Sequence, residues 1–135
     1  MRPHGLIDTG AIVALLNSND PWHGACAKAF RGLSLPLATT TAVLTEVFYH
    51  LAGHSQSLDT AWGFLLRSGS IAIAGIDADD LRQVERLMKR YLDRPMDFAD
   101  ATLVRVAERE CLSQTYISIA LSKMNLYILL FWKLL

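Results

Sequence analysis

The chain has 135 residues, of which 52% are apolar; this composition excludes an intrinsically disordered protein and fits one globular domain over residues 1–135. Its formal net charge of zero excludes a global basic field that attracts nucleic acid, so any such binding must come from a local patch. The longest uncharged apolar run, residues 124–132, is far shorter than the roughly 20 residues that span a bilayer, and we expect a cytoplasmic protein without a secretory signal or membrane span.

Strands and helices are predicted to alternate along the chain, joined by short links. The first half contains predicted strands at 5–8 and 35–39, and predicted helices at 10–17 (capped by Thr9), at about 21–31, and from Thr40 or Thr41 to Gly53. The second half contains predicted helices at 58–67, 77–94 and 98–110, predicted strands at 70–76 and 116–121, and a segment at 126–135 that is strand or helix. This alternation is typical of an α/β sandwich with a central, mainly parallel sheet.

Four acidic residues stand in apolar segments: Asp8, Glu46, Asp97 and Asp100. Burying an ionised carboxylate costs several kcal/mol unless a cation or hydrogen bonds compensate it. Asp8 follows the first predicted strand, and sites of parallel sheets form beyond the carboxyl ends of the strands. The simplest explanation for these charged residues in apolar segments is that they converge on one divalent ion. Hard oxygen ligands of this kind suit Mg²⁺ or Mn²⁺.

Helix capping is the competing explanation for three of these acids. Asp8, Asp97 and Asp100 each stand near the start of a predicted helix, where a carboxylate can cap the backbone or be favoured by the helix dipole. Glu46 lies inside its predicted helix and gains nothing from capping, which favours the metal site. A carboxylate cluster that holds one or two Mg²⁺ or Mn²⁺ ions is suited to phosphodiester hydrolysis.

The three acidic segments resemble the motifs of PIN-domain ribonucleases, and especially those of VapC-type toxins of prokaryotic toxin–antitoxin pairs. They are residues 6–11 (LIDTGA), 41–47 (TAVLTEV) and 95–101 (PMDFADA), and their order and spacing agree with the family over about residues 5–112. The resemblance implies an α/β/α PIN fold, Mg²⁺- or Mn²⁺-dependent cleavage of RNA, a homodimer and a small antitoxin partner. By position, Asp8, Glu46 and Asp100 match the family's first three acidic ligands, and Asp97 is an accessory candidate.

The resemblance stops near residue 112. Family members usually continue with a strand and an Asp-rich turn that supplies a fourth acid, whereas residues 113–135 contain no Asp or Glu. A shifted reading frame near codon 113 and true divergence are the two explanations for this loss. Because a second metal would lack ligands, we expect reduced activity. The alternative function is a catalytically impaired PIN-like module that binds RNA or a partner.

One predicted helix carries a basic face, which is the patch that we expect to steer RNA phosphates in a neutral protein. Its residues are Arg82, Arg86, Lys89 and Arg90. The acids before them, Asp77, Asp79 and Asp80, are explained by helix capping. His50 and His54 have a zinc-compatible spacing but no third ligand, so we expect surface histidines.

The remaining expectations concern burial and association. Cys26 and Cys111 are far apart in sequence and form no CxxC pair, so we expect reduced cysteines in the core. Trp22, Trp62 and the apolar segment 126–135 exceed what one small domain is expected to bury, which predicts a homodimer.

Overall fold

A parallel sheet lies at the centre of the structure. The computed structural model describes residues 2–52, 55–93, 96–112 and 116–117. Within these ranges the strands are β1 (Gly5–Ile7), β2 (Leu37–Thr40), β3 (Ile71–Ala74) and β4 (Tyr116–Ile117). Their order is β3-β2-β1-β4, and each neighbouring pair is parallel, which confirms the predicted sheet. The predicted segment at 126–135 lies outside the described residues.

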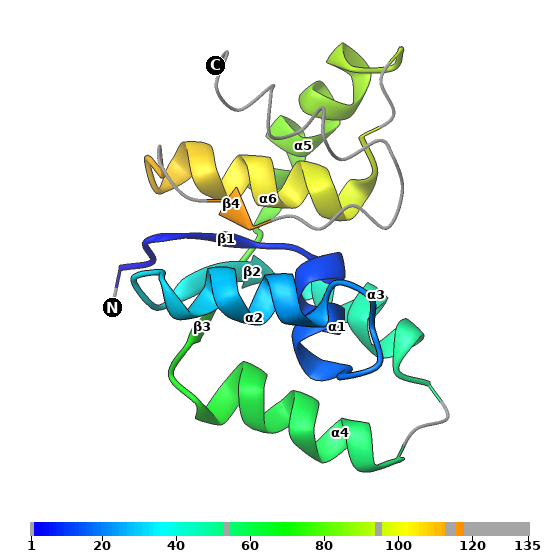
Figure 1. Cartoon of the computed structure of the whole chain (residues 1–135). Helices are drawn as coiled ribbons and strands as arrows, with labels where there is room; N and C mark the ends of the chain where they lie inside the picture. Colours follow the sequence, from blue (N-terminus) through cyan, green and yellow to red (C-terminus); the bar gives the residue numbers. More distant parts are fainter. Residues whose placement is uncertain (1, 53–54, 94–95, 113–115, 118–135) are drawn as a thin grey trace.

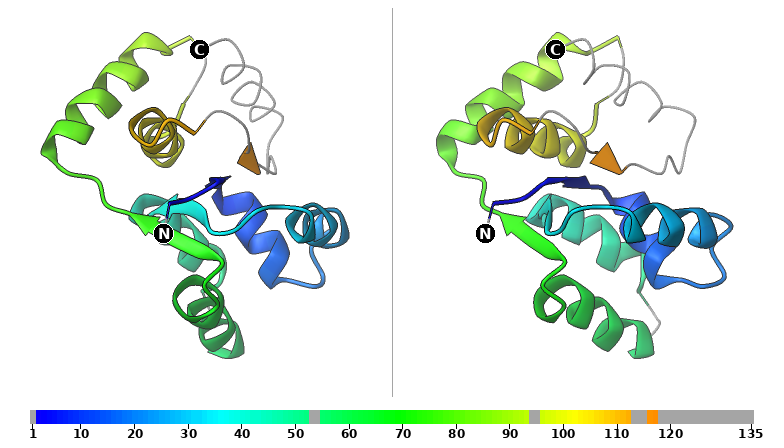
Figure 2. Two further views of the ribbon diagram at one scale, coloured as in Figure 1. Left: turned by 90° about the vertical axis from the view of Figure 1, so that its left-hand side faces the viewer. Right: turned by 60° about the vertical axis from the view of Figure 1, so that its left-hand side comes forward.

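Helices cover both faces of the sheet (Figure 1, Figure 2). On one face lie α5 (Ala78–Arg90) and α6 (Phe98–Arg109). On the other lie α1 (Thr9–Leu16), α3 (Thr41–His50) and α4 (Ser55–Trp62). Helix α4 continues as the π-helical turn η1 (Gly63–Arg67). Helix α2 (His23–Arg31) packs against α1. This is the predicted α/β/α sandwich. Within the described ranges, none of the helices combines the length and the hydropathy that crossing a bilayer requires.

Short polar side chains start most of these helices. Asp8 caps α1 by accepting a hydrogen bond from the backbone three residues on, so the predicted cap Thr9 is wrong and Thr9 is the first helical residue. Thr40 caps α3, as predicted, and Asp77 forms a reciprocal capping box with Asp80 at the start of α5. Each cap satisfies a backbone N–H that has no partner inside its helix.

The core lies between the sheet and the helices. Every residue of β1 and β2 is buried, which explains why these strands contain few polar residues beyond the terminal threonines. A second apolar cluster joins α5 to α6; its buried members are Val84, Leu87, Tyr91, Ala101 and Val104. The sheet edge and the start of α6 are therefore held by two packed layers.

The two cysteines are free, as predicted, but they differ in burial. Cys26 is 2% exposed, and its burial, together with the negative charges of Asp8 and Asp20, raises the pKa of its thiol to about 11. Cys111 is exposed, so its expected place in the core is wrong. It lies just beyond the last residue of α6, where the chain leaves the helix with a backbone φ of 53°.

Candidate metal centre

The four predicted acids come from three elements at the carboxyl edge of the sheet. Asp8 directly follows β1, and Glu46 lies in α3, which begins where β2 ends. Asp97 is the N-cap of α6, and Asp100 lies in its first turn. Asp8 is 4% exposed, Glu46 and Asp100 are half-buried, and Asp97 is exposed. The cluster thus runs from the buried strand end out to solvent.

A pair of buried threonines holds the start of α6 against the end of β2. The Oγ1 atoms of Thr40 and Thr102 are 2.8 Å apart, and Thr102 Oγ1 also donates to the carbonyl oxygen of Ala99 over 2.7 Å. Because a hydroxyl has one proton, Thr40 is the donor in the first of these bonds. The link keeps the turn with Asp97 and Asp100 beside the strand ends.

Thr9 orients the carboxylate of Glu46. Its hydroxyl donates to Glu46 Oε2 over 2.8 Å, while the neighbouring Asp8 accepts from the backbone N–H of Ala11 over 2.9 Å. Glu46 is therefore turned toward the end of β1, where Asp8 stands. Sequence reasoning assigned Thr9 to capping and missed this contact, for which the position next to Asp8 was the only signal.

The other three acids act on the carboxyl group of Asp100. Burial raises the pKa of Asp100, and the nearby negative charge of Asp97, a hydrogen bond with Asp97, and the charges of Asp8 and Glu46 raise it further, to about 7. Each neighbouring carboxylate disfavours the ionised form of Asp100. A cation among these groups would relieve that repulsion.

The acids nevertheless do not form a finished ligand shell. Within the described ranges, no group of three or more His, Cys, Asp or Glu side chains is gathered closely enough to hold an ion. Metal–oxygen bonds are about 2.0–2.6 Å long, whereas charges influence one another over roughly 10 Å, so electrostatic coupling reaches further than coordination. The predicted residues are therefore neighbours, but their present side-chain positions do not make a ligand set.

The predicted basic face of α5 is solvent-exposed, but half of it is neutralised locally. Its cations are Arg82, Arg86, Lys89 and Arg90. Arg82 pairs with Asp79, and Lys89 pairs with Glu85. Among the described residues, Arg86 and Arg90 enter no ion pair, and the Arg90 guanidinium lies 5.5 Å from the centre of the Tyr91 ring.

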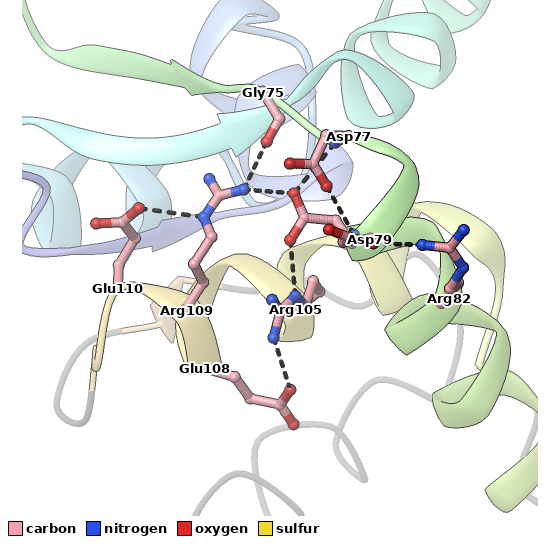
Figure 3. Close-up of polar contacts among 9 residues, drawn as sticks. Gly75, Asp77, Asp79, Arg82, Arg105, Glu108, Arg109 and Glu110 are labelled. Carbon is pink, nitrogen blue, oxygen red and sulfur yellow. Dashed lines mark hydrogen bonds and ion pairs between the residues drawn. The ribbon is translucent and has the colours of Figure 1, made fainter.

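Asp80 does more than cap α5. It is 2% exposed and accepts from Arg105 Nε over 2.8 Å and from an Nη atom of Arg109 over 2.7 Å. Arg109 also donates to the carbonyl oxygen of Gly75 over 2.8 Å, so α6, α5 and the end of β3 are tied together (Figure 3). Capping alone is therefore an incomplete explanation of Asp80. This link holds the last turns of α6, away from the acids at its start.

Comparisons with known proteins agree with this architecture. The family model described as the PIN domain matches residues 5–114. The chain is 27% identical over 106 residues to Ribonuclease VapC26 of Mycobacterium tuberculosis (strain ATCC 25618 / H37Rv), and the match covers 77% of this chain and 78% of the relative. The crystal structure of Mycobacterium tuberculosis VapC20, described as a Sarcin-Ricin loop cleaving toxin, matches this chain with a TM-score of 0.76 and 20% sequence identity. The match covers 86% of this chain and 89% of the VapC20 chain, and it shows that the two share a fold.

Proposed function

Because this chain belongs to the PIN-domain family, we propose that it is a metal-dependent endoribonuclease of VapC type, and the toxin of a toxin–antitoxin pair. The observation that carries the proposal is the group of four acidic side chains at the carboxyl edge of a parallel sheet, where three of them raise the pKa of the fourth, Asp100. The name of the relative VapC26, a ribonuclease, supports RNA as the substrate. The absence of a global positive charge fits a site that acts through local groups.

The donor set fits a hard divalent cation. Asp8, Glu46 and Asp100 would hold Mg²⁺ or Mn²⁺, since these ions prefer carboxylate oxygens and often bind through a few carboxylates and waters. The raised pKa of Asp100 supports this, because its causes are burial, which is the largest, and then the negative charges of neighbouring carboxylates. When bound, such an ion polarises the attacking water and neutralises charge that builds on the phosphate.

The protein's own groups then have separate tasks. Thr9 keeps the Glu46 carboxylate facing Asp8, so that one ligand is oriented before an ion arrives. Asp97 caps α6 with one carboxylate oxygen and is solvent-exposed beside Asp100, and its proposed task is to accept a proton from water at the site. The Thr40–Thr102 bond keeps both of these acids at the sheet edge.

Arg86 and Arg90, which enter no ion pair with the residues that the structure describes, mark the proposed path for RNA phosphates along α5. Tyr91 and Ala101 share one apolar cluster, and they follow Arg90 and Asp100 in sequence. The basic end of α5 therefore lies toward the acidic end of α6. Positive charge at that place offsets the repulsion between the acids and a polyanion, and it accounts for binding by a neutral protein.

We also propose a homodimer and an antitoxin partner. Leu58, Trp62 and Leu66 recur every four residues along α4 and η1 and are 43%, 38% and 59% exposed. An exposed apolar stripe of this kind is typical of an association surface. Light scattering at tens of micromolar should give the dimer mass; the monomer mass would reject self-association. Coexpression of a neighbouring small gene that restores growth would support the antitoxin.

The deciding experiment is RNA cleavage with and without Mn²⁺, combined with calorimetric Mn²⁺ binding by the Asp8→Asn, Glu46→Gln and Asp100→Asn variants. We expect cleavage only with the metal and a strong loss of Mn²⁺ affinity in each variant, with the fold retained by circular dichroism. Unchanged Mn²⁺ binding in all three variants would refute the shared site.

The alternative function is a PIN-like module that binds RNA or a partner without cleaving it. Residues 113–135 contain no Asp or Glu that could act as a ligand. This favours binding of one metal ion over two, and we therefore expect weak nuclease activity. RNA binding without cleavage by the wild-type chain would favour this alternative. A variant with an Asp-containing turn grafted after Ser113 should be more active than the chain as given.

A further inference from the structure

A pocket of about 230 Å³ opens between α3 and α6 at the carboxyl edge of the sheet. The residues that line it are Thr41, Ala42, Thr45, Ile76, Phe98 and Thr102. Ile76 lies just beyond β3, and the other five come from the first turns of the two helices. This volume is below the roughly 300–1,000 Å³ of most small-molecule sites, which suits one planar group of a larger ligand.

The pocket adjoins the acidic cluster. Ala42 lies one helical turn before Glu46, so both are on the same face of α3. Phe98 lies between Asp97 and Asp100 in the first turn of α6. A nucleotide with its phosphate at the acids would therefore have its neighbouring base within reach of the pocket.

The lining suits an aromatic, hydrogen-bonding ligand. The Phe98 side chain is 47% exposed and stacks on no ring of the described residues. Thr45 donates its hydroxyl proton to the carbonyl oxygen of Thr41 over 3.1 Å, which leaves the Thr45 oxygen able to accept a hydrogen bond. The pocket therefore offers a free aromatic face beside a polar rim.

We propose that this pocket holds one unpaired base of the RNA, stacked on Phe98 and read by the hydroxyls of Thr41 and Thr45. The inference rests on the proposed ribonuclease function and adds to it the determinant of base preference. Single-stranded RNA is recognised by aromatic stacking and by hydrogen bonds to base edges, which a duplex does not expose. The substrate would thus be a loop or single strand.

The test uses the whole chain and single-stranded RNA with one 2-aminopurine, moved along the sequence. Fluorescence is measured in EDTA, where a metal-dependent nuclease leaves the RNA intact, and cleavage rates are measured in Mn²⁺. The variants are Phe98→Leu, which removes the ring, Phe98→Trp, which keeps one, and Tyr49→Leu as a control at an aromatic residue that is 79% exposed and outside the pocket.

We expect quenching at one position in the wild type, in Phe98→Trp and in the control, and its loss in Phe98→Leu. Phe98→Leu should lower kcat/KM about 5- to 100-fold with unchanged Mn²⁺ binding, since stacking on one aromatic contributes that much. Thr45→Val should change which base is preferred. If the wild type cleaves RNA and Phe98→Leu matches the control, the pocket proposal is wrong.

The outcome also separates this proposal from the nuclease itself. Quenching that depends on Phe98, without cleavage in Mn²⁺, would keep the base pocket and refute the ribonuclease. Neither quenching nor cleavage in the wild type would overturn both.

Discussion

Replacing Asp80 by Asn should destabilise the protein strongly although the residue lies away from the proposed site. The Asp80 carboxylate accepts hydrogen bonds from Arg105, Arg109 and the backbone of Asp77, and it is almost completely buried. Asn retains an oxygen for the backbone bond but loses the charge that both guanidinium groups face. The arginines would then be partly buried without a counter-charge.

The magnitude follows from that burial. Removing one partner of a fully buried ion pair costs about 3–5 kcal/mol. The side chains of Arg105 and Arg109 are 23% and 30% exposed, so water can partly solvate them after the change. We therefore expect a loss near the lower limit, about 3 kcal/mol, which lowers Tm by about 10 °C in a protein of this size.

The assay is urea unfolding followed by circular dichroism, with Asp79→Asn as the matched control. Asp79 carries the same charge one residue earlier, but its side chain is 83% exposed and pairs only with the exposed Arg82. Such surface pairs contribute about 0–1 kcal/mol. Equal unfolding free energies for the two variants would refute the reasoning.

The pH dependence gives a second check. Burial by itself raises the pKa of Asp80, but the Asp77 hydrogen bond, the Arg105 hydrogen bond and the charges of Arg109 and Arg105 outweigh it and lower the pKa below its ordinary 3.8. A carboxyl group whose pKa is lower in the folded than in the unfolded state stabilises the protein at pH values above its unfolded-state pKa. This stabilisation is lost as the pH falls through the folded-state pKa. The Asp80→Asn penalty should therefore be full at neutral pH and shrink below about pH 3.8. A penalty that stayed constant there would argue against the ion pair.

Three further outcomes are expected. Thr39→Val should stabilise the fold by about 1 kcal/mol in urea unfolding, because the buried Thr39 hydroxyl has no hydrogen-bond partner among the described residues; a loss of stability would contradict this. Thr9→Val should weaken calorimetric Mn²⁺ binding by about tenfold, since Glu46 loses its orienting bond; unchanged affinity would exclude that role. Charge reversal at Arg86 and Arg90 should weaken RNA association and reduce its salt dependence without affecting Mn²⁺ binding, and an unchanged salt slope would place the RNA on another surface.

The sequence alone determined the order of the elements, and it predicted the acidic residues of the proposed site. Helix bounds follow from the local spacing of apolar residues and from the cap and turn residues that flank them. The bounds of α3, α5 and α6 were therefore predicted within a few residues of the observed ones. Parallel strand order then brings the residues that follow successive strands to one edge, where Thr9, next to Asp8, donates a hydrogen bond to Glu46.

Only the tertiary structure decided how the side chains meet. The bond from Thr40 to Thr102 spans 62 residues, and the contacts from Asp80 to Arg105 and Arg109 span 25 and 29, so no local pattern signals them. Whether Asp8 or Thr9 caps α1 depends on the backbone of a single residue at the strand end, where Asp8 is extended and Thr9 is helical. Such contacts arise when separate helices pack on one sheet, because packing, rather than spacing along the chain, brings their polar groups within hydrogen-bond distance.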